Sequence, residues 1–268
     1  MIYLETNSLR ILANKLSDAN FVQNKYTSIL AVIELLSGIK DNNEYQRRRG
    51  IINRIVESEM YNRIHPLFPT TIFYKAFGCN MNDEEDAHSI IDLLKIIATI
   101  PDYNDFITFI SIHKKFEEYF HFTQDFDNTS SKHFISLMVD KSKNADTKKL
   151  IPEFESRWTE KDFNYILNIA VNYYASKIPA NLANGRTFDE LVTSYNKSIN
   201  PFLLASTYYV DQKISLKNNV AKNDSIDLLH LLYIGETDTM VSDDALLNRI
   251  LTIAYPNCIV KTSDMKLE

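Results

Sequence analysis

Glycine is scarce in this 268-residue sequence, which contains only 5 glycines. No G-x-G-x-x-G pattern and no P-loop pattern occurs, and both motifs need glycines where the backbone approaches a phosphate. Cysteine is rarer still, because only Cys79 and Cys258 are present and they match no zinc-binding spacing. These shortages argue against a nucleotide-binding loop, exclude a disulfide framework and favour a reducing cytoplasm.

Long apolar runs are also missing. No stretch of about 18 uncharged apolar residues occurs, and the N-terminus lacks the basic-then-apolar layout of a signal peptide. We therefore expect a soluble, cytoplasmic protein without a membrane partner. The formal net charge of −6 argues against a protein that coats nucleic acid through its overall field. It leaves room for an enzyme that grips nucleic acid locally, since the acids of a metal site add negative charge.

Strand-like runs alternate with helical patterns at both ends of the chain, which is typical of a parallel α/β sheet. The expected strands cover residues 2–4, 239–241 and 258–261, and the expected helices cover 9–15, 26–39, 43–64, 224–234 and 243–255. The middle of the sequence is helical in pattern and rich in aromatics. We therefore predict an α/β core formed by residues 1–65 and 218–268, interrupted by a mostly helical insertion over residues 66–217.

Glu34 stands in an apolar context that no helix cap explains. It lies inside "ILAVIELLSGI", where a helix that is apolar on most faces is largely buried. A buried carboxylate must be paired, neutralised or bound to a metal, because an isolated buried charge costs many kcal/mol. The nearest cations in the sequence are Lys40 and Arg47 to Arg49, and none of them lies on the same helical turn.

Other acids follow the expected strands. Glu5 follows the first strand directly, and Asp243 and Asp244 follow "TMV" in the same way. Ligand sites of parallel sheets lie outside the carboxyl ends of the strands, so these acids point to one crevice. Asp224 and Asp227, at the start of a helix, would reach the same rim.

Converging carboxylates repel one another, and a divalent cation resolves that repulsion. Oxygen ligands select Mg²⁺ or Mn²⁺ over zinc. A second explanation stays open for each acid taken alone. Asp224 stands where a helix cap belongs, and Ser242 or Asp243 could cap the following helix.

The combined pattern resembles the PIN-domain nucleases. The first strand of that family ends in a D-T-N type motif, similar here to "YLETNS", and a second acid follows in a helix, as Glu34 does in "AVIELLSG". A third acid opens a D-x-x-h helix, for which Asp227 is the best match. A fourth follows a strand as T-x-D, with Ser242 and Asp244 in those places.

The resemblance covers about the first 40 and the last 50 residues. It implies a three-layer α/β/α fold around a parallel sheet, and an Mg²⁺- or Mn²⁺-dependent ribonuclease of the kind found in toxin–antitoxin pairs. By the same resemblance, the metal ligands and catalytic residues are Glu5, Glu34, Asp227 and Asp244. Asn7 and Ser242 would orient ligands or the phosphate, and Asp224 and Asp243 are secondary candidates.

Our leading hypothesis is a metal-dependent endoribonuclease. The expected partners are RNA or single-stranded DNA, an antitoxin or regulatory protein, and a second copy of the chain. Glu5 stands where the family usually has Asp, and an extra methylene moves a carboxylate by about 1.5 Å. That departure motivates an alternative, a non-catalytic PIN-like module that binds RNA or protein. A phosphoesterase acting on small substrates is the third hypothesis.

Three further features have two explanations each. Arg47, Arg48 and Arg49 form either a phosphate-gripping patch or a solvated helix face with salt bridges. His113, Glu117 and His121 share one helix face and could bind zinc, although they lack the H-E-x-x-H arrangement. The tyrosines of "NYY" and "STYYV" could stack on bases, but at helical spacing they are more typical of a core.

Overall fold

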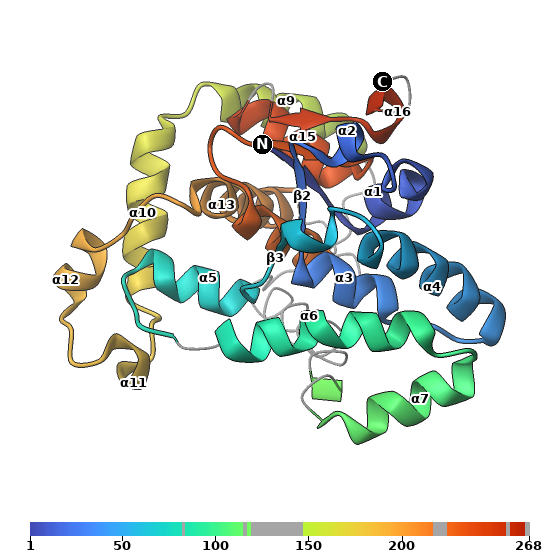
Figure 1. Cartoon of the computed structure of the whole chain (residues 1–268). Coiled ribbons are helices and arrows are strands. Elements are labelled where there is room, and N and C mark those ends of the chain that lie inside the picture. Colours follow the sequence, from blue (N-terminus) through green and yellow to red (C-terminus); the bar gives the residue numbers. More distant parts are fainter. Residues whose placement is uncertain (82–83, 115–116, 119–146, 217–223, 256–257, 266–268) are drawn as a thin grey trace.

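A computed structural model describes residues 1–81, 84–114, 117–118, 147–216, 224–255 and 258–265 (Figure 1). Within these residues five parallel strands form one sheet in the order β3-β2-β1-β4-β5. The strands are β1 (Ile2–Leu4), β2 (Lys25–Ser28), β3 (Ile64–His65), β4 (Thr239–Val241) and β5 (Ile259–Val260). Because β1 pairs with both β2 and β4, the two ends of the chain share this sheet. The prediction of an α/β protein with a parallel sheet is confirmed.

Helices make up the remaining elements. Those of the two terminal segments are α1 (Thr6–Ile11), η1 (Ala13–Lys15), α2 (Ala19–Val22), α3 (Ile29–Leu36), α4 (Asn42–Val56), η2 (Tyr61–Arg63), α14 (Asp224–Leu229), η3 (His230–Tyr233), α15 (Ala245–Ala254) and α16 (Thr262–Met265). Those between residues 66 and 217 are α5 (Pro69–Ala76), α6 (Glu84–Thr99), α7 (Tyr103–Ile112), α9 (Thr147–Thr159), α10 (Phe163–Ala175), α11 (Ala180–Ala183), α12 (Phe188–Thr193) and α13 (Asn200–Ser215).

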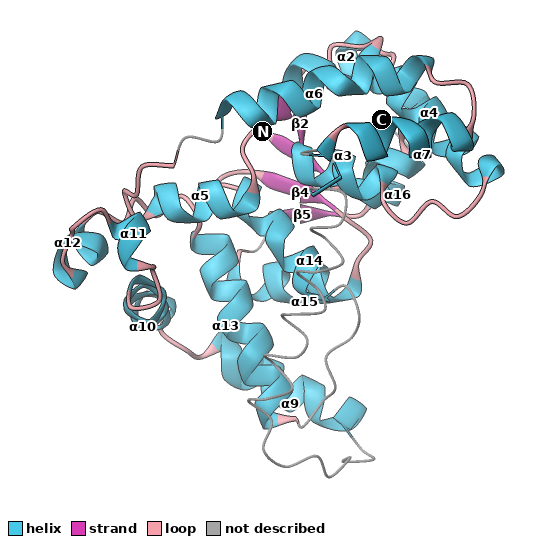
Figure 2. Cartoon of the chain, turned by 90° about the horizontal axis from the view of Figure 1, so that it is seen from below, coloured by secondary structure: helices cyan, strands magenta, loops and turns pink. Residues whose placement is uncertain are grey.

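Each face of the sheet carries its own hydrophobic cluster. Successive strand residues point to opposite faces, so Tyr3 and Met240 enter one cluster while Leu4 and Val241 enter the other. Helices α13, α14 and α15 cover the first face, and α3, α4 and α6 cover the second (Figure 2). The sheet therefore lies between two helical layers.

The helices between residues 66 and 217 contribute to both layers. Leu203 and Tyr208 of α13 belong to the cluster of Tyr3, whereas Ile97 of α6 and Phe106 of α7 belong to the cluster of Leu4. Across the described residues no helix combines the length and the apolar character that a membrane crossing needs. The division into a discontinuous core and a separate helical insertion stays a prediction.

Several boundaries differ from the expected ones. The helix expected over residues 26–39 begins only at Ile29, because Lys25–Ser28 form β2 and the Ser28 hydroxyl caps α3 by accepting the Ala31 N–H at 3.1 Å. The helix expected over residues 43–64 ends at Val56, and β3 follows it. Strands of two to four residues are too short to show a period of two, so the neighbouring helical periodicity conceals them.

Candidate functional site

Three of the four predicted acids lie where strands end or a helix begins, at one edge of the sheet. Glu5 follows β1 directly, and two residues separate the end of β4 from Asp244. The pairing of Leu4 with Val241 places the two strand ends side by side. Asp227 lies in the first turn of α14, and Glu34 lies near the end of α3. Parallel strands thus bring segments from both ends of the sequence to one place.

The electrostatics of Asp227 show that all four acids share one cluster. Burial is the largest cause that raises the pKa of Asp227 from 3.8 to about 8, and the charge of Asp244 is the next. Glu34 and Glu5 raise this pKa further, whereas His230 lowers it. No described residue donates a hydrogen bond to the Asp227 carboxylate, and the charge of His230 offsets the burial and the neighbouring acids only in part.

Glu5 caps a helix and belongs to the cluster at the same time. Its Oε2 accepts the Asn7 N–H at 2.7 Å, and the Ser8 hydroxyl lies 3.4 Å from Oε1. Burial raises the pKa of Glu5, and the charge of His230 and the Asn7 hydrogen bond offset this only in part. The cap at the start of α1 therefore holds the Glu5 carboxylate in a buried place, where its ionised form is unfavourable.

Glu34 is paired with a histidine that the sequence did not single out as its partner. Its Oε2 accepts from His230 Nε2 and from the Thr6 hydroxyl, each at 2.6 Å. Burial raises the pKa of Glu34, but the charge and hydrogen bond of His230 outweigh it and hold the pKa below its usual value. The neighbouring cations Lys40 and Arg47 to Arg49 are not the partners of this carboxylate.

His230 is buried behind Glu34. It is 1% exposed, and its Nδ1 lies 2.6 Å from the Tyr3 hydroxyl, which lies 2.7 Å from the Ser28 hydroxyl. Burial lowers the pKa of His230, but the charges of Glu34, Glu5 and Asp227 raise it above its ordinary value. A buried cation at i+3 from Asp227 is thus part of the acid cluster.

Asp244 and Ser242 form the turn that joins β4 to α15. The Leu247 N–H donates to Asp244 Oδ1 at 2.8 Å, and the Asp244 N–H donates to the buried Ser242 hydroxyl at 3.1 Å. Asp244 is therefore a helix cap whose second oxygen, Oδ2, accepts no hydrogen bond from a described residue. Ser242 holds the turn and orients Asp244 through the backbone.

The two secondary acids serve other contacts. Asp224 Oδ2 accepts from the Tyr209 hydroxyl at 2.8 Å and pairs with Lys213 Nζ at 3.1 Å, so this residue fastens α14 to α13. Asp243 Oδ1 accepts the Thr262 N–H at 3.0 Å and ties the loop after β4 to α16. Both carboxylates have structural partners outside the cluster.

Arg48 and Arg49 make structural contacts, and phosphate binding by Arg47 to Arg49 stays a prediction. Arg48 is buried and donates to the Leu35 carbonyl at 3.0 Å, to the Ser37 carbonyl and to the Glu44 carboxylate. It thereby satisfies carbonyls at the end of α3, where no further helical turn follows. Arg49 Nε donates to the Ala98 carbonyl of α6 at 2.9 Å.

Two exposed arginines remain beside the site. Arg47 is exposed and lies 3.9 Å from Glu44. Arg10, which the sequence analysis overlooked, is exposed on α1 and donates to the Asn7 amide oxygen at 3.4 Å. Burial lowers the pKa of Arg10, Arg48 and Arg47 add to this, and the charges of Glu34 and Glu5 oppose it. Asn7 and Arg10 thus share the exposed face of α1 next to the acids.

The rival sites receive no support. His113 ends α7 and packs its ring 4.3 Å from that of Phe109, while His121 lies outside the described residues. Tyr208 and Tyr209 are core residues, as expected, whereas Tyr173 is 49% exposed on α10. A helical spacing alone does not separate such exposed tyrosines from buried ones.

The cluster fits a hydrated divalent cation better than a fully protein-ligated one. Among the described residues no group of three or more His, Cys, Asp or Glu side chains is arranged to hold a metal ion. Mg²⁺ commonly keeps several waters and binds through only one or two carboxylates. Among the described residues nothing donates a hydrogen bond to Asp227 or to Oδ2 of Asp244, so these two carboxylates could provide that number of ligands.

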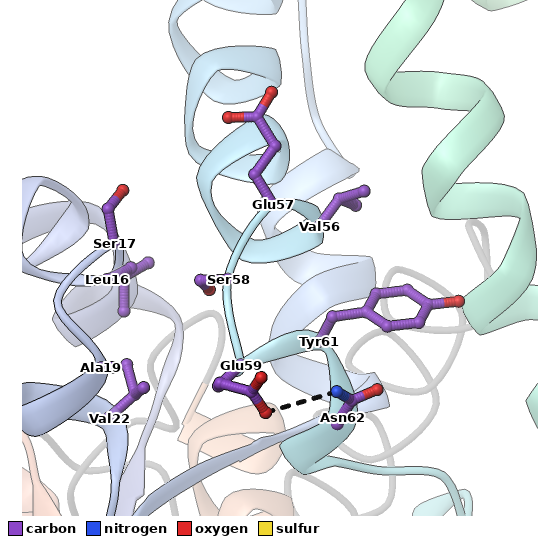
Figure 3. Close-up of a pocket in the computed structure, with 10 residues that line it drawn as sticks. All are labelled: Leu16, Ser17, Ala19, Val22, Val56, Glu57, Ser58, Glu59, Tyr61 and Asn62. Carbon is purple, nitrogen blue, oxygen red and sulfur yellow. Dashed lines mark hydrogen bonds between the residues drawn. The ribbon is translucent and has the colours of Figure 1, made fainter.

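Two cavities lie away from the acid cluster. One of about 300 Å³ lies between the segment around Leu16 and the end of α4, and Figure 3 shows Glu59 on its wall accepting a hydrogen bond from Asn62 at 3.4 Å. Another of about 310 Å³ lies against His65 and Tyr233. The acid cluster lines neither of them.

No family model, curated protein or solved structure matches this chain.

Proposed function

We propose that this chain is an Mg²⁺- or Mn²⁺-dependent nuclease, an endoribonuclease that hydrolyses phosphodiester bonds at the cluster of Glu5, Glu34, Asp227 and Asp244. The observation that carries the proposal is that Glu5 and Asp244 follow the paired strands β1 and β4. Burial and three neighbouring acids raise the pKa of Asp227 beside them to about 8. A fold that gathers mutually repelling carboxylates without a fixed partner for Asp227 is typical of a functional site.

Each residue has a role that follows from its contacts. Asp227 and Asp244 would hold the cation directly, and Glu5 would do so once its weak contact with Ser8 is released. Arg10 and Asn7, exposed beside these acids, would bind the phosphate backbone of RNA by charge and hydrogen bonds. Ser242 would keep Asp244 in position through its hydrogen bond to the backbone.

The reaction consumes one water. Its oxygen forms a bond to phosphorus, the bond from phosphorus to the leaving ribose oxygen breaks, and that oxygen gains the proton that the water loses. A bound Mg²⁺ or Mn²⁺ would make the water more acidic and offset the charge that develops on the phosphate. No side chain forms a covalent intermediate.

The proposal includes a PIN-like arrangement of the three layers and a cytoplasmic setting in which RNA is available. The strand ends that carry Glu5 and Asp244, together with Glu34 on α3, support the PIN-like arrangement. An antitoxin or other regulatory protein is the partner that a nuclease of the toxin class requires. A second copy of the chain is the remaining partner that we propose.

Cleavage assays with a neighbouring control test this function. Labelled single-stranded RNA and DNA would be incubated with Mn²⁺, Mg²⁺ or EDTA, using the wild type, Asp244→Asn and Asp243→Asn. We expect metal-dependent RNA cleavage that Asp244→Asn abolishes and Asp243→Asn retains. Among the described residues, Asp243 binds the Thr262 N–H and no other group. Absence of cleavage and of metal binding in the wild type would overturn the proposal.

A non-catalytic RNA- or protein-binding module is the second candidate. Two observations favour it: Glu34 is already neutralised by His230, and Glu5 is engaged at the start of α1. A Glu5→Asp variant distinguishes the two. Activity that appears only in this variant would show that the natural chain binds without cutting.

A further inference from the structure

A buried chain of hydrogen bonds stands behind Glu34. It runs from the Ser28 hydroxyl to the Tyr3 hydroxyl at 2.7 Å, then to His230 Nδ1 at 2.6 Å, and from His230 Nε2 to Glu34 Oε2 at 2.6 Å. The Thr6 hydroxyl donates to the same Oε2 at 2.6 Å. Ser28 and Tyr3 are fully buried, so the chain joins two strand residues to the acid cluster without solvent.

Packing fixes the members of this chain. The Tyr3 ring stacks on that of Tyr233 with centroids 5.9 Å apart and an interplanar angle of 6°, and its other neighbours are Tyr26 and His230. A ring confined in this way places its hydroxyl at one point. The imidazole of His230 is therefore held from Nδ1 and can present Nε2 in one direction only.

The chain treats the two oxygens of Glu34 differently. Two donors, from His230 and Thr6, occupy Oε2, whereas no described residue donates to Oε1. The Glu34 side chain is 20% exposed, so part of it can contact water. A carboxylate fastened through one oxygen offers a single acceptor in a fixed place.

A buried pair of this kind contributes little net stability. Replacing buried ion pairs by apolar residues of similar volume is often neutral or stabilising, because desolvation offsets the Coulomb attraction. Stability alone therefore does not account for His230 and Glu34 at the edge of an acid cluster. A positioning role accounts for them, because it requires a carboxylate that is held through one oxygen.

We propose that His230, held by Tyr3, is a positioning residue that would keep Glu34 out of direct contact with a bound cation. Glu34 Oε1 would then orient the attacking water, and Asp227 and Asp244 would hold the cation. This inference rests on the proposed nuclease function. It departs from the four-ligand set expected from the sequence. Glu34 would orient the water instead of binding the metal, and His230 would balance its charge.

Metal binding separates the two assignments of Glu34. Mn²⁺ would be titrated by calorimetry into the full-length wild type, Glu34→Gln and Asp244→Asn, each checked for folding by thermal unfolding. We expect Asp244→Asn to weaken Mn²⁺ binding by more than about 100-fold and Glu34→Gln by only about tenfold, the lower end of the loss for a residue outside the metal's direct ligands. Equal losses in the two variants would make Glu34 a ligand and overturn the inference.

Removing one hydroxyl tests the positioning itself. Tyr3→Phe keeps the buried ring but breaks the bond to His230, and Tyr45→Phe is the control, because Tyr45 is equally buried and donates to the Ile100 carbonyl at 3.1 Å. For Tyr3→Phe we expect kcat on RNA to fall about tenfold, with KM within about twofold. Tyr45→Phe should change neither constant. An unchanged kcat in Tyr3→Phe would overturn the positioning role.

Failure of the inference and failure of the function give different results. A wild type that neither binds Mn²⁺ nor cleaves RNA would overturn both. A wild type that binds and cleaves, but whose Glu34→Gln variant loses Mn²⁺ as Asp244→Asn does, would overturn only the inference. A wild type that binds Mn²⁺ without cleaving still reports on Glu34, because the titration alone decides whether Glu34 is a ligand.

Discussion

Nε2 of His230 lies 2.6 Å from Oε2 of Glu34, although the two residues are 196 positions apart in the sequence. The pair joins α3 to η3. Its electrostatics are reciprocal, because Glu34 raises the pKa of His230 while His230 holds the pKa of Glu34 below its usual value. Both shifts favour the ion pair at neutral pH.

Breaking this pair from one side should cost stability. His230→Leu leaves the Glu34 carboxylate without its buried counter-charge, and we expect the free energy of unfolding at pH 6 to fall by about 3 kcal/mol. Because the pKa of His230 is raised in the folded state, its contribution is complete below the unfolded pKa of about 6.5 and is lost as the pH rises through the folded value. Urea denaturation measures both effects. A double variant that also carries Glu34→Leu should recover at least half of the loss, and no recovery would contradict the pairing.

Asp227→Asn should stabilise the metal-free protein at alkaline pH. The pKa of Asp227 rises from 3.8 to about 8 on folding, so the folded state holds a proton that the unfolded state releases between these values. Stability therefore falls as the pH rises from 3.8 towards 8, and an asparagine lacks this dependence. At pH 8.5 in EDTA we expect the variant to be more stable than the wild type by at least about 1 kcal/mol. The difference should vanish near pH 4 in urea denaturation, and a constant difference would contradict the assignment.

Divalent cations should replace that proton. At about 100 times its dissociation constant, a ligand of the folded state adds about 2.7 kcal/mol, so Mn²⁺ should raise the melting temperature of the wild type at pH 8. Asp227→Asn and Asp244→Asn should lose this rise, because each removes a carboxylate of the cluster. Asp224→Asn and Asp243→Asn are the matched controls, since their carboxylates bind Lys213 and the Thr262 N–H. A rise that all four variants keep would place the cation elsewhere.

The sequence was sufficient to predict the sheet class and the positions of the acids, and physical reasons explain both. Glu5 and Asp244 follow strands of clear apolar character, and parallel strands bring their carboxyl ends together. The need of Glu34 for a partner could be predicted, because a carboxylate in an apolar helix is costly to bury alone. The identity of that partner was not visible, because His230 meets Glu34 only through a tertiary contact.

The arginines show that a run of like charges in the sequence does not by itself predict a charged surface. Three consecutive arginines suggest a charged surface, but successive helix residues point in different directions, so Arg48 turns to the end of α3 and Arg49 to α6. Arg10 was not predicted to bind nucleic acid, because no other arginine lies near it in the sequence. Charge density along the chain is a poor guide to charge density in space.

Arg48 and Arg47 should therefore differ in their effect on stability. Arg48→Ala leaves the Leu35 and Ser37 carbonyls without their donor and removes the ion pair with Glu44, so we expect a loss of about 2 to 3 kcal/mol in the free energy of unfolding. Arg47→Ala removes only an exposed contact and should change it by less than about 0.5 kcal/mol. Chemical denaturation of both variants at pH 7 measures the difference. Equal losses of stability in the two variants would show that Arg48 behaves as a solvated surface residue.

Arg10 should contribute to RNA binding as an isolated phosphate contact. Its guanidinium lies on the exposed face of α1 beside Asn7 and feels the charges of Glu34 and Glu5. A metal held by Asp227 and Asp244 would bind one phosphate, and Arg10 would bind a neighbouring one. For a single strand, each neutralised phosphate contributes about −0.7 to the slope of log K against log salt. We expect Arg10→Ala to make that slope shallower by about this amount. Fluorescence anisotropy of labelled single-stranded RNA between about 50 and 200 mM salt, with Ca²⁺ in place of Mg²⁺, measures it. Lys177→Ala removes one exposed charge beyond the end of α10 and should leave the slope unchanged. If both variants shift the slope equally, RNA responds to overall charge and Arg10 has no place at the site.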